Sequence, residues 1–338
     1  MFLKNTWYVA AWSRDVGDSL LPRTVLNEKI VLYRTTNKTI VALEDACPHR
    51  KLPLSKGRKL GDIIECGYHG LQFDCFGVCV LAPTQNFIPR LKIKAYPIAE
   101  KWGLVWIWMG DFDSADESKI LDITNYHNPA WGVTSGGTLE INCNYLWLTD
   151  NLLDPSHVAW VHRTSFFGPG TDDTPLQIQT FDDGVLASRW IFNQPLPPYY
   201  APVVKFSGHC DRLQHYEVRV PSICINRSIF TRAGTGGENC KLDDKAYLIT
   251  SYNFMTPIDS QRTTYYWFQH YNTDVDDEAV ANRINEGAVA AFNEDREILE
   301  AVQVGMDGKN TRNINLGIDA ASIKYRKLLS TFIANEQE

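Results

Sequence analysis

The segment from Asp150 to His162 places two carboxylates, Asp150 and Asp154, and two imidazoles, His157 and His162, among mostly apolar residues. Charged side chains are rarely buried without a partner or a metal ion. Two histidines and one carboxylate, with coordination positions left open, are the ligands with which non-heme Fe(II) activates oxygen. A polar helix face carrying two unrelated histidines would account for the same residues, so this segment alone does not decide between the two.

A second group of metal-ligating residues lies upstream, where Cys47 and His49 form one pair and Cys66 and His69 form another. A structural zinc site usually pairs Cys with Cys and His with His. Here each pair supplies one residue of each kind, which suits a cluster of two unlike irons. In the Rieske arrangement one iron takes both thiolates and the other takes both imidazoles. The spacing therefore favours a Rieske [2Fe–2S] cluster over zinc.

A further carboxylate is expected on a long helix between Asp276 and Gln303. At about 100° per residue, Asp295 falls within an apolar stripe, whereas Glu294 and Glu297 point elsewhere. A buried carboxylate is costly unless it is paired, so Asp295 is predicted to be the carboxylate ligand of a metal. A bond to a backbone amide or an arginine is the alternative. The stripe comprises Val280, Ile284, Ala288, Ala291, Ile298, Leu299 and Val302.

The spacing of His157 and His162 also constrains the helix that carries them. Five residues at about 100° each would leave the two imidazoles about 140° apart on a straight α-helix. That divergence is too large for both rings to bind one ion. We therefore expect a π-bulge, a kink or a break between Pro155 and His162, because such distortions recur at functional sites.

The elements around these residues change in character along the chain. Residues 1–112 form short apolar or alternating runs separated by turn residues, which predicts an all-β domain. After a linker rich in Asp and Ser, longer alternating strands predict an antiparallel sheet with a single solvent-exposed face. The expected strands of this second part are Thr138–Asn142, Gln177–Thr180, Val185–Phe192, Gln214–Val220, Ser222–Thr231, Ala246–Met255 and Thr263–Tyr271.

Composition limits the class of protein. The chain has 338 residues, 44% of them hydrophobic and 22% charged, as expected for a globular enzyme of about two domains. A net charge of −7 argues against nucleic acid or an anionic membrane as the main partner. No apolar run approaches the roughly 18 residues needed to cross a bilayer. Eight cysteines without a signal peptide indicate a reducing cytoplasm and no disulfide framework.

Taken together, the two motifs resemble the oxygenase component of a Rieske non-heme iron oxygenase, and the resemblance runs nearly end to end. The cysteine–histidine pairs match the family's cluster motif, and the spacing of Asp154, His157 and His162 matches its iron motif. The opening Asn5–Ala10 is similar to the vanillate O-demethylase, dicamba demethylase and toluenesulfonate methyl-monooxygenase branch.

The resemblance implies an α+β fold, with an N-terminal all-β Rieske domain at residues 1–112 and a C-terminal helix-grip catalytic domain at residues 113–338. It implies that Asp295 completes the iron ligands of His157 and His162. It also implies a homotrimer in which Asp154 bridges a cluster histidine and an iron histidine across a subunit boundary. Asn151 is expected to border the iron.

The same resemblance implies a monooxygenase that hydroxylates or O-demethylates a small, often anionic, aromatic substrate. The chain carries no G-x-G-x-x-G fingerprint for flavin or nicotinamide, so a separate NAD(P)H-dependent reductase or ferredoxin must supply electrons. Ring dihydroxylation or N-demethylation by the same iron is the alternative reaction. A Rieske electron carrier with a degenerate second site is the alternative from another class of protein.

Overall fold

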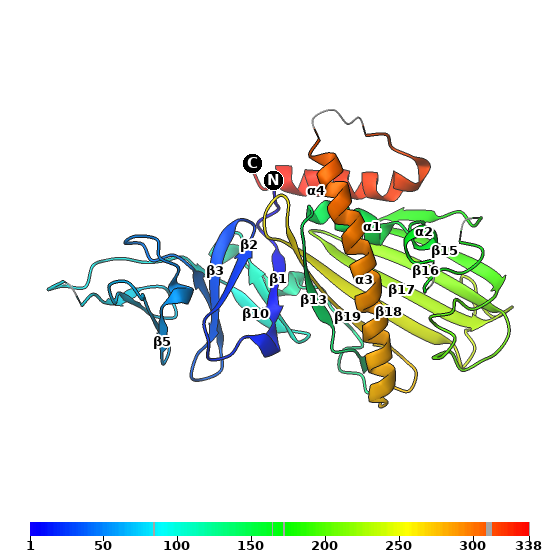
Figure 1. Cartoon of the computed structure of the whole chain (residues 1–338), viewed down its shortest axis with the longest axis horizontal. Coiled ribbons are helices and arrows are strands. Elements are labelled where there is room, and N and C mark those ends of the chain that lie inside the picture. Colours follow the sequence, from blue (N-terminus) through cyan, green and yellow to red (C-terminus); the bar gives the residue numbers. More distant parts are fainter. Residues whose placement is uncertain (84, 164, 172, 309–312, 338) are drawn as a thin grey trace. The chain divides into compact units, whose positions relative to one another are not determined.

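The computed structural model describes residues 1–83, 85–163, 165–171, 173–308 and 313–337, and these form two compact units (Figure 1). The first comprises Met1–Asp122 with Thr256–Asp259, and the second comprises Ile123–Met255 with Ser260–Glu338. The expected fold class is confirmed, since an all-β unit is joined to an antiparallel sheet with a few helices. The domain boundary after residue 112 stays a prediction. No described helix has the length and apolar character needed to cross a membrane.

The first unit is built from three small sheets whose strands are short. The sheets order their strands as β1-β11-β10, β2-β3-β4-β9 and β5-β6-β7-β8. Two apolar clusters fill the space between them, and Cys47 and Cys66 belong to the second cluster. The strands are β1 (Trp7–Trp12), β2 (Leu21–Val25), β3 (Glu28–Arg34), β4 (Ile40–Glu44), β5 (Arg58–Leu60), β6 (Ile63–Glu65), β7 (Gln72–Phe73), β8 (Cys79–Leu81), β9 (Ala95–Tyr96), β10 (Ile98–Lys101) and β11 (Leu104–Trp108).

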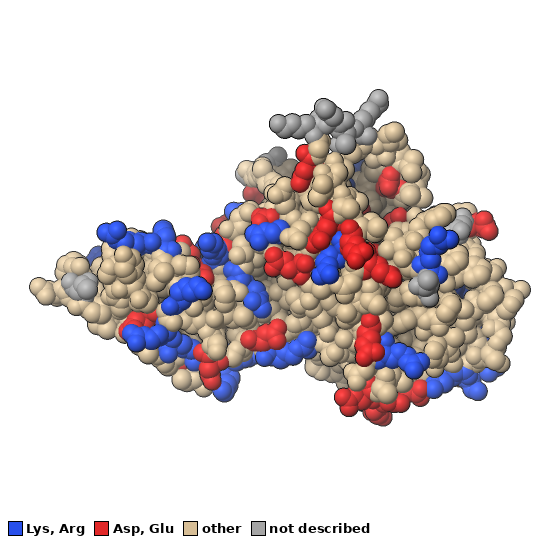
Figure 2. All heavy atoms as spheres, in the orientation of Figure 1, with Lys and Arg blue, Asp and Glu red and all other residues tan. Residues whose placement is uncertain are grey.

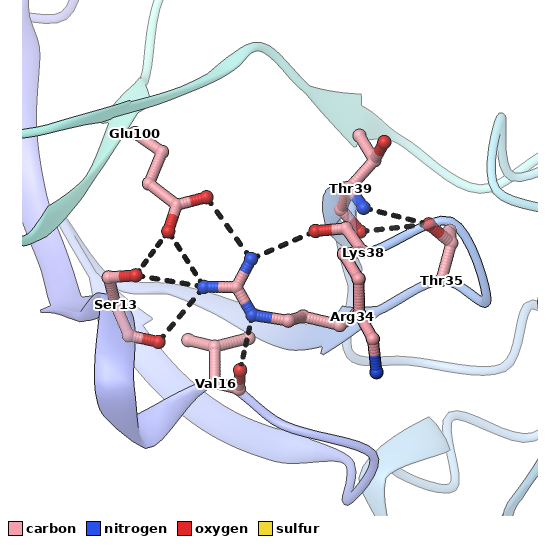
Figure 3. A network of polar contacts seen from close by, with 7 residues as sticks. All are labelled: Ser13, Val16, Arg34, Thr35, Lys38, Thr39 and Glu100. Atoms are coloured by element: carbon pink, nitrogen blue, oxygen red, sulfur yellow. Dashed lines mark hydrogen bonds and ion pairs between the residues drawn. The ribbon is translucent and has the colours of Figure 1, made fainter.

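A polar network around Arg34 ties the end of β3 to β10 in this unit (Figure 3). Its guanidinium donates to Glu100 Oε1 and Oε2 at 2.7 and 3.1 Å and to Ser13 Oγ at 2.8 Å. It also donates to the carbonyl oxygens of Val16 and Lys38 at 2.8 and 2.9 Å. One side chain therefore holds three separate segments of the chain together.

Replacing Arg34 with methionine should lower the free energy of unfolding by about 1–2 kcal/mol, because the lost hydrogen bonds are charge-assisted but partly solvated. The hydrogen bond from Arg34 and the adjacent positive charge hold the pKa of Glu100 below its usual value of 4.5, although burial opposes them. This contribution is therefore complete at neutral pH and is lost as the pH falls through the lowered pKa.

Urea unfolding of wild type and Arg34→Met at neutral and acidic pH measures both effects. The gap between the two proteins should shrink on acidification. Arg90→Met is the control, since Arg90 is exposed in the same unit. An equal gap at both pH values would contradict the assigned role of Glu100.

The second unit is organised around an eight-stranded antiparallel sheet of order β12-β19-β18-β17-β16-β15-β14, in which β13 also pairs with β19. The helix α3 crosses one face of this sheet (Figure 1). The strands are β12 (Gly132–Val133), β13 (Gly137–Ile141), β14 (Gln177–Thr180), β15 (Gly184–Gln194), β16 (Cys210–Arg219), β17 (Ile223–Arg232), β18 (Tyr247–Pro257) and β19 (Thr263–Tyr271). The helices are α1 (Tyr145–Leu153), α2 (Val158–Val161), α3 (Glu278–Met306) and α4 (Ala320–Asn335).

The prediction of a single solvent-exposed sheet face is wrong for β18 and β19. Every residue of β19 except Thr264 is buried. The side chains on both faces of this strand are therefore buried, and neither face is exposed to solvent. The reason is that aromatic side chains also cover the face opposite α3. The ring of Tyr126 lies 5.7 Å from the rings of both Phe268 and His270.

The stripe predicted on α3 is confirmed at Ile284, Ala288, Ala291, Asp295 and Leu299, all of which are buried. It is wrong at Ile298 and Val302, which are 48% and 38% exposed. The buried face ends instead at Gln303. The side-chain oxygen of Gln303 accepts hydrogen bonds from Asn144 N and Trp147 Nε1, at 2.8 and 3.0 Å. The start of α1 therefore packs on the Gln303 side of α3, and Ile298 and Val302 remain exposed to solvent.

The surface charges are unevenly distributed. Basic side chains are prominent on the visible face of the first unit, whereas acidic ones gather along α3 and at its N-terminal end (Figure 2). The visible face of the first unit is therefore predominantly basic.

Candidate functional site

Two loops of the first unit hold the cysteine–histidine pairs, and they close in the same way. Cys47 follows β4 and donates its N–H to Leu52 O at 2.9 Å, and Cys66 follows β6 and donates to Leu71 O at 2.8 Å. In each loop the carbonyl of the cysteine accepts from the N–H four residues later, at 2.8 and 3.1 Å. The two loops are therefore structural counterparts that present their side chains toward one another.

The side chains of these loops are sorted by ligand type. The two thiols are buried and face each other, and both burial and the neighbouring Cys66 raise the pKa of Cys47. The Nδ1 atoms of His49 and His69 lie 3.1 Å apart, on the more exposed side. Two nitrogens that meet at one point and two sulfurs that meet at another fit a cluster of two unlike irons. The same donors do not follow the usual zinc spacing.

In the second unit the helix carrying the two histidines is broken, as the sequence predicted. Helix α1 ends at Leu153 and α2 begins at Val158, so that His157 and His162 flank the short helix α2. Proline disfavours a helical conformation in the residue before it. Asp154 precedes Pro155 and is accordingly extended, with φ −103° and ψ 102°. The break brings the two imidazole centroids to 5.2 Å.

Asp295 joins these two rings from α3. Its Oδ1 lies 3.3 Å from His162 Nε2 and 3.6 Å from His157 Nε2. One ligand atom from each of the three residues lies within 4.8 Å of the others. Asp295 is 4% exposed, and its Oδ1 has no hydrogen-bond partner among the described residues. A buried carboxylate oxygen beside two imidazole nitrogens fits a divalent cation such as Fe(II).

The outer nitrogens of both rings have acceptors that fix the tautomer. His157 Nδ1 donates to the backbone oxygen of Asp154 at 2.5 Å, and His162 Nδ1 donates to Glu294 Oε2 at 2.6 Å. Burial alone lowers the pKa of His162, but its contacts with Asp295 and Glu294 outweigh burial, so that the pKa is raised. When the two rings are neutral, both Nε2 lone pairs therefore point toward Asp295, in a site of negative potential.

The expectation that Glu294 points elsewhere is wrong. A helical wheel gives the direction of the Cβ atom, but a glutamate side chain is long enough to reach around the helix to His162. The available signal was chemical, because a ligating histidine normally donates its other nitrogen to a carboxylate or carbonyl.

Glu294→Gln should weaken binding of the metal ion at the His157/His162/Asp295 site by about 10- to 100-fold, the usual cost of removing an outer partner of a ligating histidine. Titration of the apoprotein with Co(II), followed by absorbance, measures the affinity. Glu297→Gln is the matched control, since Glu297 is exposed on the same helix. Equal Co(II) affinity of the two variants would show that Glu294 does not support metal binding at the site.

The remaining predicted residues lie around the triad. The Asp154 carboxylate accepts from Ser156 N and Ser156 Oγ, both at 2.8 Å. Asn151 Nδ2 is buried and has no hydrogen-bond partner among the described residues. The roles expected for Asp154 and Asn151 stay predictions. Asp150 instead pairs with Arg326 of α4, and burial raises its pKa despite that partner.

A cavity of about 140 Å³ opens onto the triad, between the sheet and α3. Its volume is close to the ~150 Å³ of an engineered apolar cavity that holds benzene. Aromatic and aliphatic side chains form most of its walls, and polar side chains of β16, β17 and β18 line the sheet side. The cavity is therefore matched to one aromatic ring with small substituents.

The family models divide the chain between two descriptions. The Rieske [2Fe-2S] domain matches residues 6–97, and the vanillate O-demethylase oxygenase C-terminal domain matches residues 141–335. The cysteine–histidine pairs lie in the first match, and the triad lies in the second.

Relatives cover most of the chain. The iron–sulfur subunit of the toluene-4-sulfonate monooxygenase system of Comamonas testosteroni is 39% identical over 89% of this chain and 88% of the relative. The vanillate O-demethylase oxygenase subunit of Pseudomonas sp. (strain HR199 / DSM 7063) is 33% identical over 100% of this chain and 97% of the relative. Dicamba monooxygenase bound to 3,6-dichlorosalicylic acid superposes with a TM-score of 0.92 at 27% identity, over 99% of both chains.

Proposed function

The chain belongs to the oxygenase components of the Rieske non-heme iron oxygenases, and on that premise we propose that it hydroxylates or O-demethylates a small aromatic substrate. The observation that carries this proposal is the cavity of about 140 Å³, which is sized for one aromatic ring and opens onto His157, His162 and Asp295. The curated relatives named for toluene-4-sulfonate and vanillate support an aromatic substrate attacked at a methyl or methoxy group.

Each cofactor of the family has a set of residues that would hold it. Cys47 and Cys66 would hold one iron of the Rieske cluster, and His49 and His69 would hold the other. The triad of His157, His162 and Asp295 would hold the mononuclear iron, which when bound supplies the activation of O2.

The protein residues around the triad orient the substrate and exclude water. The ring of Phe166 lies 5.9 Å from that of His162, and the two further rings of Tyr199 and Tyr200 pack against Phe166. Helix α3 covers the opposite side with Ala288 and Ala291, both buried. A methyl or methoxy group that enters this cavity would be held beside the triad and away from bulk solvent.

Electrons would come from a separate NAD(P)H-dependent reductase or ferredoxin. The positive surface of the first unit would attract an acidic donor (Figure 2). The proposal includes a head-to-tail homotrimer, in which Asp154 links the triad to the cluster of a neighbouring subunit. A head-to-tail contact that closes on itself produces cyclic symmetry.

Two alternatives use the same residues. Oxidation of a carbon attached to nitrogen is supported by a relative named chloroacetanilide N-alkylformylase, from Rhizorhabdus wittichii (strain DC-6 / KACC 16600), at 29% identity over 99% of this chain and 97% of the relative. Ring dihydroxylation would need both oxygen atoms on the ring. A pure electron carrier has no use for a buried carboxylate and two imidazoles at an internal cavity.

A screen of substituted aromatics tests the proposal. Holoenzyme, a surrogate reductase and NADH would be mixed with 4-methoxybenzoate or 4-methylbenzenesulfonate. The N-methyl analogues 4-(methylamino)benzoate and 4-(methylamino)benzenesulfonate would be tested in the same way. Consumption of O2 should rise with an active aromatic, with one formaldehyde or one hydroxymethyl product formed per NADH. NADH oxidation that is independent of every aromatic, without product, would reject the proposal.

A further inference from the structure

Arg212 of β16 is a buried cation on the wall of the cavity. The residue is 2% exposed. Its Nη2 donates to Gly168 O at 2.7 Å, to Pro169 O at 2.8 Å and to Thr171 Oγ1 at 2.8 Å. Its Nε is buried without a hydrogen-bond partner in the described part of the chain. All of its fixed partners are therefore neutral oxygens.

This arrangement differs from that of two other arginines in the same unit. Arg219 pairs with Asp183 and Glu217, and Arg326 pairs with Asp150. Among the described residues, no carboxylate lies within ion-pair distance of Arg212. A buried charge without a counter-charge is costly, and burial accordingly lowers the pKa of the guanidinium. The free-energy cost of removing such a charge from water is offset when an anion enters the cavity beside it.

The strand register places Arg212 at one end of a polar strip on the cavity side of the sheet. Arg212 is opposite Phe230, Gln214 is opposite Ser228, and Tyr216 is opposite Asn226. These six residues all line the cavity. Burial raises the pKa of Tyr216 to about 12, and this phenol lies within electrostatic range of both Arg212 and Asp295. Arg212 and the triad therefore face one shared space.

We propose that Arg212 binds the oxyanion of an aryl carboxylate or aryl sulfonate, and that the far side of the ring is thereby directed toward His157, His162 and Asp295. The inference rests on the proposed function and assigns recognition of the negative charge of the substrate to one side chain, Arg212. Carboxylate and sulfonate both carry negatively charged oxygen atoms that accept charge-assisted hydrogen bonds from a guanidinium. Gln214 and Ser228, which lie beside Arg212 on the strip, supply neutral hydrogen-bonding groups for the remaining oxygen atoms.

A purely structural role is the competing explanation. The three hydrogen bonds of Nη2 brace the loop at residues 168–171, and that role needs no ligand. The two roles differ in one measurable respect. Only an anion site makes ligand affinity depend on the charge of the ligand as well as on its shape.

Binding of isosteric pairs to the iron-loaded protein, measured by calorimetry without O2 or reductase, tests this difference. The pairs are benzoate with benzamide, and benzenesulfonate with benzenesulfonamide. Wild type should bind at least one anion about 10- to 100-fold more tightly than its neutral partner, the range of a hydrogen bond to a charged group. The pair with the larger ratio distinguishes carboxylate from sulfonate.

The variants assign the preference to one side chain. Arg212→Met should abolish the anion preference, and Arg212→Lys should retain part of it. Arg227→Met is the matched control, because Arg227 is exposed and its neighbour Ser228 faces the cavity. Thermal unfolding and iron content would be measured for each protein. If Arg212→Met does not fold, the wild-type ratios and the Arg212→Lys variant still decide.

Three outcomes overturn the proposal: neither anion binds wild type, each anion binds no more tightly than its neutral partner, or the preference survives in Arg212→Met. These outcomes are separate from failure of the proposed function. An anion preference without aromatic-dependent O2 consumption would keep the anion site and reject the oxygenase. Turnover of neutral and anionic aromatics with equal affinity would keep the oxygenase and reject the anion site.

Discussion

Replacing Asp295 with alanine should remove the mononuclear iron and leave the Rieske cluster in place. Asp295 is 4% exposed, and its carboxylate offers one of the three ligand atoms gathered at the site. Without it, two neutral imidazoles remain to hold a divalent ion, and affinity should fall by more than the ~100-fold that loss of an outer partner can cost. Product formation should fall below detection.

Iron and sulfide analysis measures this outcome directly. Wild type should contain one iron per chain beyond those of the cluster, and Asp295→Ala should contain only the cluster irons with an unchanged cluster absorbance. Glu297→Ala is the control on the same helix. Full iron content and turnover in Asp295→Ala would make Glu294 the better candidate ligand, because Asp150 is already paired with Arg326.

Two inactive variants should regain activity when they are assembled together. Cys47→Ser should lack the cluster and His157→Ala should lack the iron, so that neither variant should support turnover alone. If electrons cross between subunits, a His157→Ala chain can supply the cluster and a Cys47→Ser chain can supply the iron. Random assembly of equal amounts places such a pair at roughly a quarter of the ordered interfaces.

The two variants would be co-expressed, or unfolded and refolded together, so that the result does not depend on subunit exchange between folded assemblies. A simple mixture of the folded variants is the control and should stay inactive. Mixed trimers confirmed by native mass spectrometry that show no activity would reject the crossed electron path. The same result would contradict the proposed role of Asp154 in linking the two metal sites between subunits.

The sequence was sufficient for the features that depend on spacing and on backbone chemistry. The divergence of His157 and His162 on a straight helix required a break, and Pro155 and the conformation of Asp154 produce it. The burial of Asp295 followed from its place on the apolar stripe. In each case the constraint is local, acting within a few residues along the chain.

The features that the sequence did not show depend on packing between distant segments. Ile298 and Val302 are exposed because α1 packs beside Gln303, which no helical wheel can anticipate. Glu294 reaches His162 across 132 residues of sequence. Arg212 lies in an ordinary alternating strand, and it becomes distinctive only when the cavity and the absence of a carboxylate beside it in the described residues are known.

The most direct test of the whole account is a single turnover without a reductase. The holoenzyme would be reduced chemically under anaerobic conditions, freed of reductant and mixed with O2 in the presence or absence of 4-methoxybenzoate. The account predicts that the cluster is reoxidised rapidly only when the aromatic is bound, with 4-hydroxybenzoate and formaldehyde formed in equal amounts, and that Asp295→Ala gives neither. Reoxidation at the same rate with and without the aromatic, and no product, would contradict it.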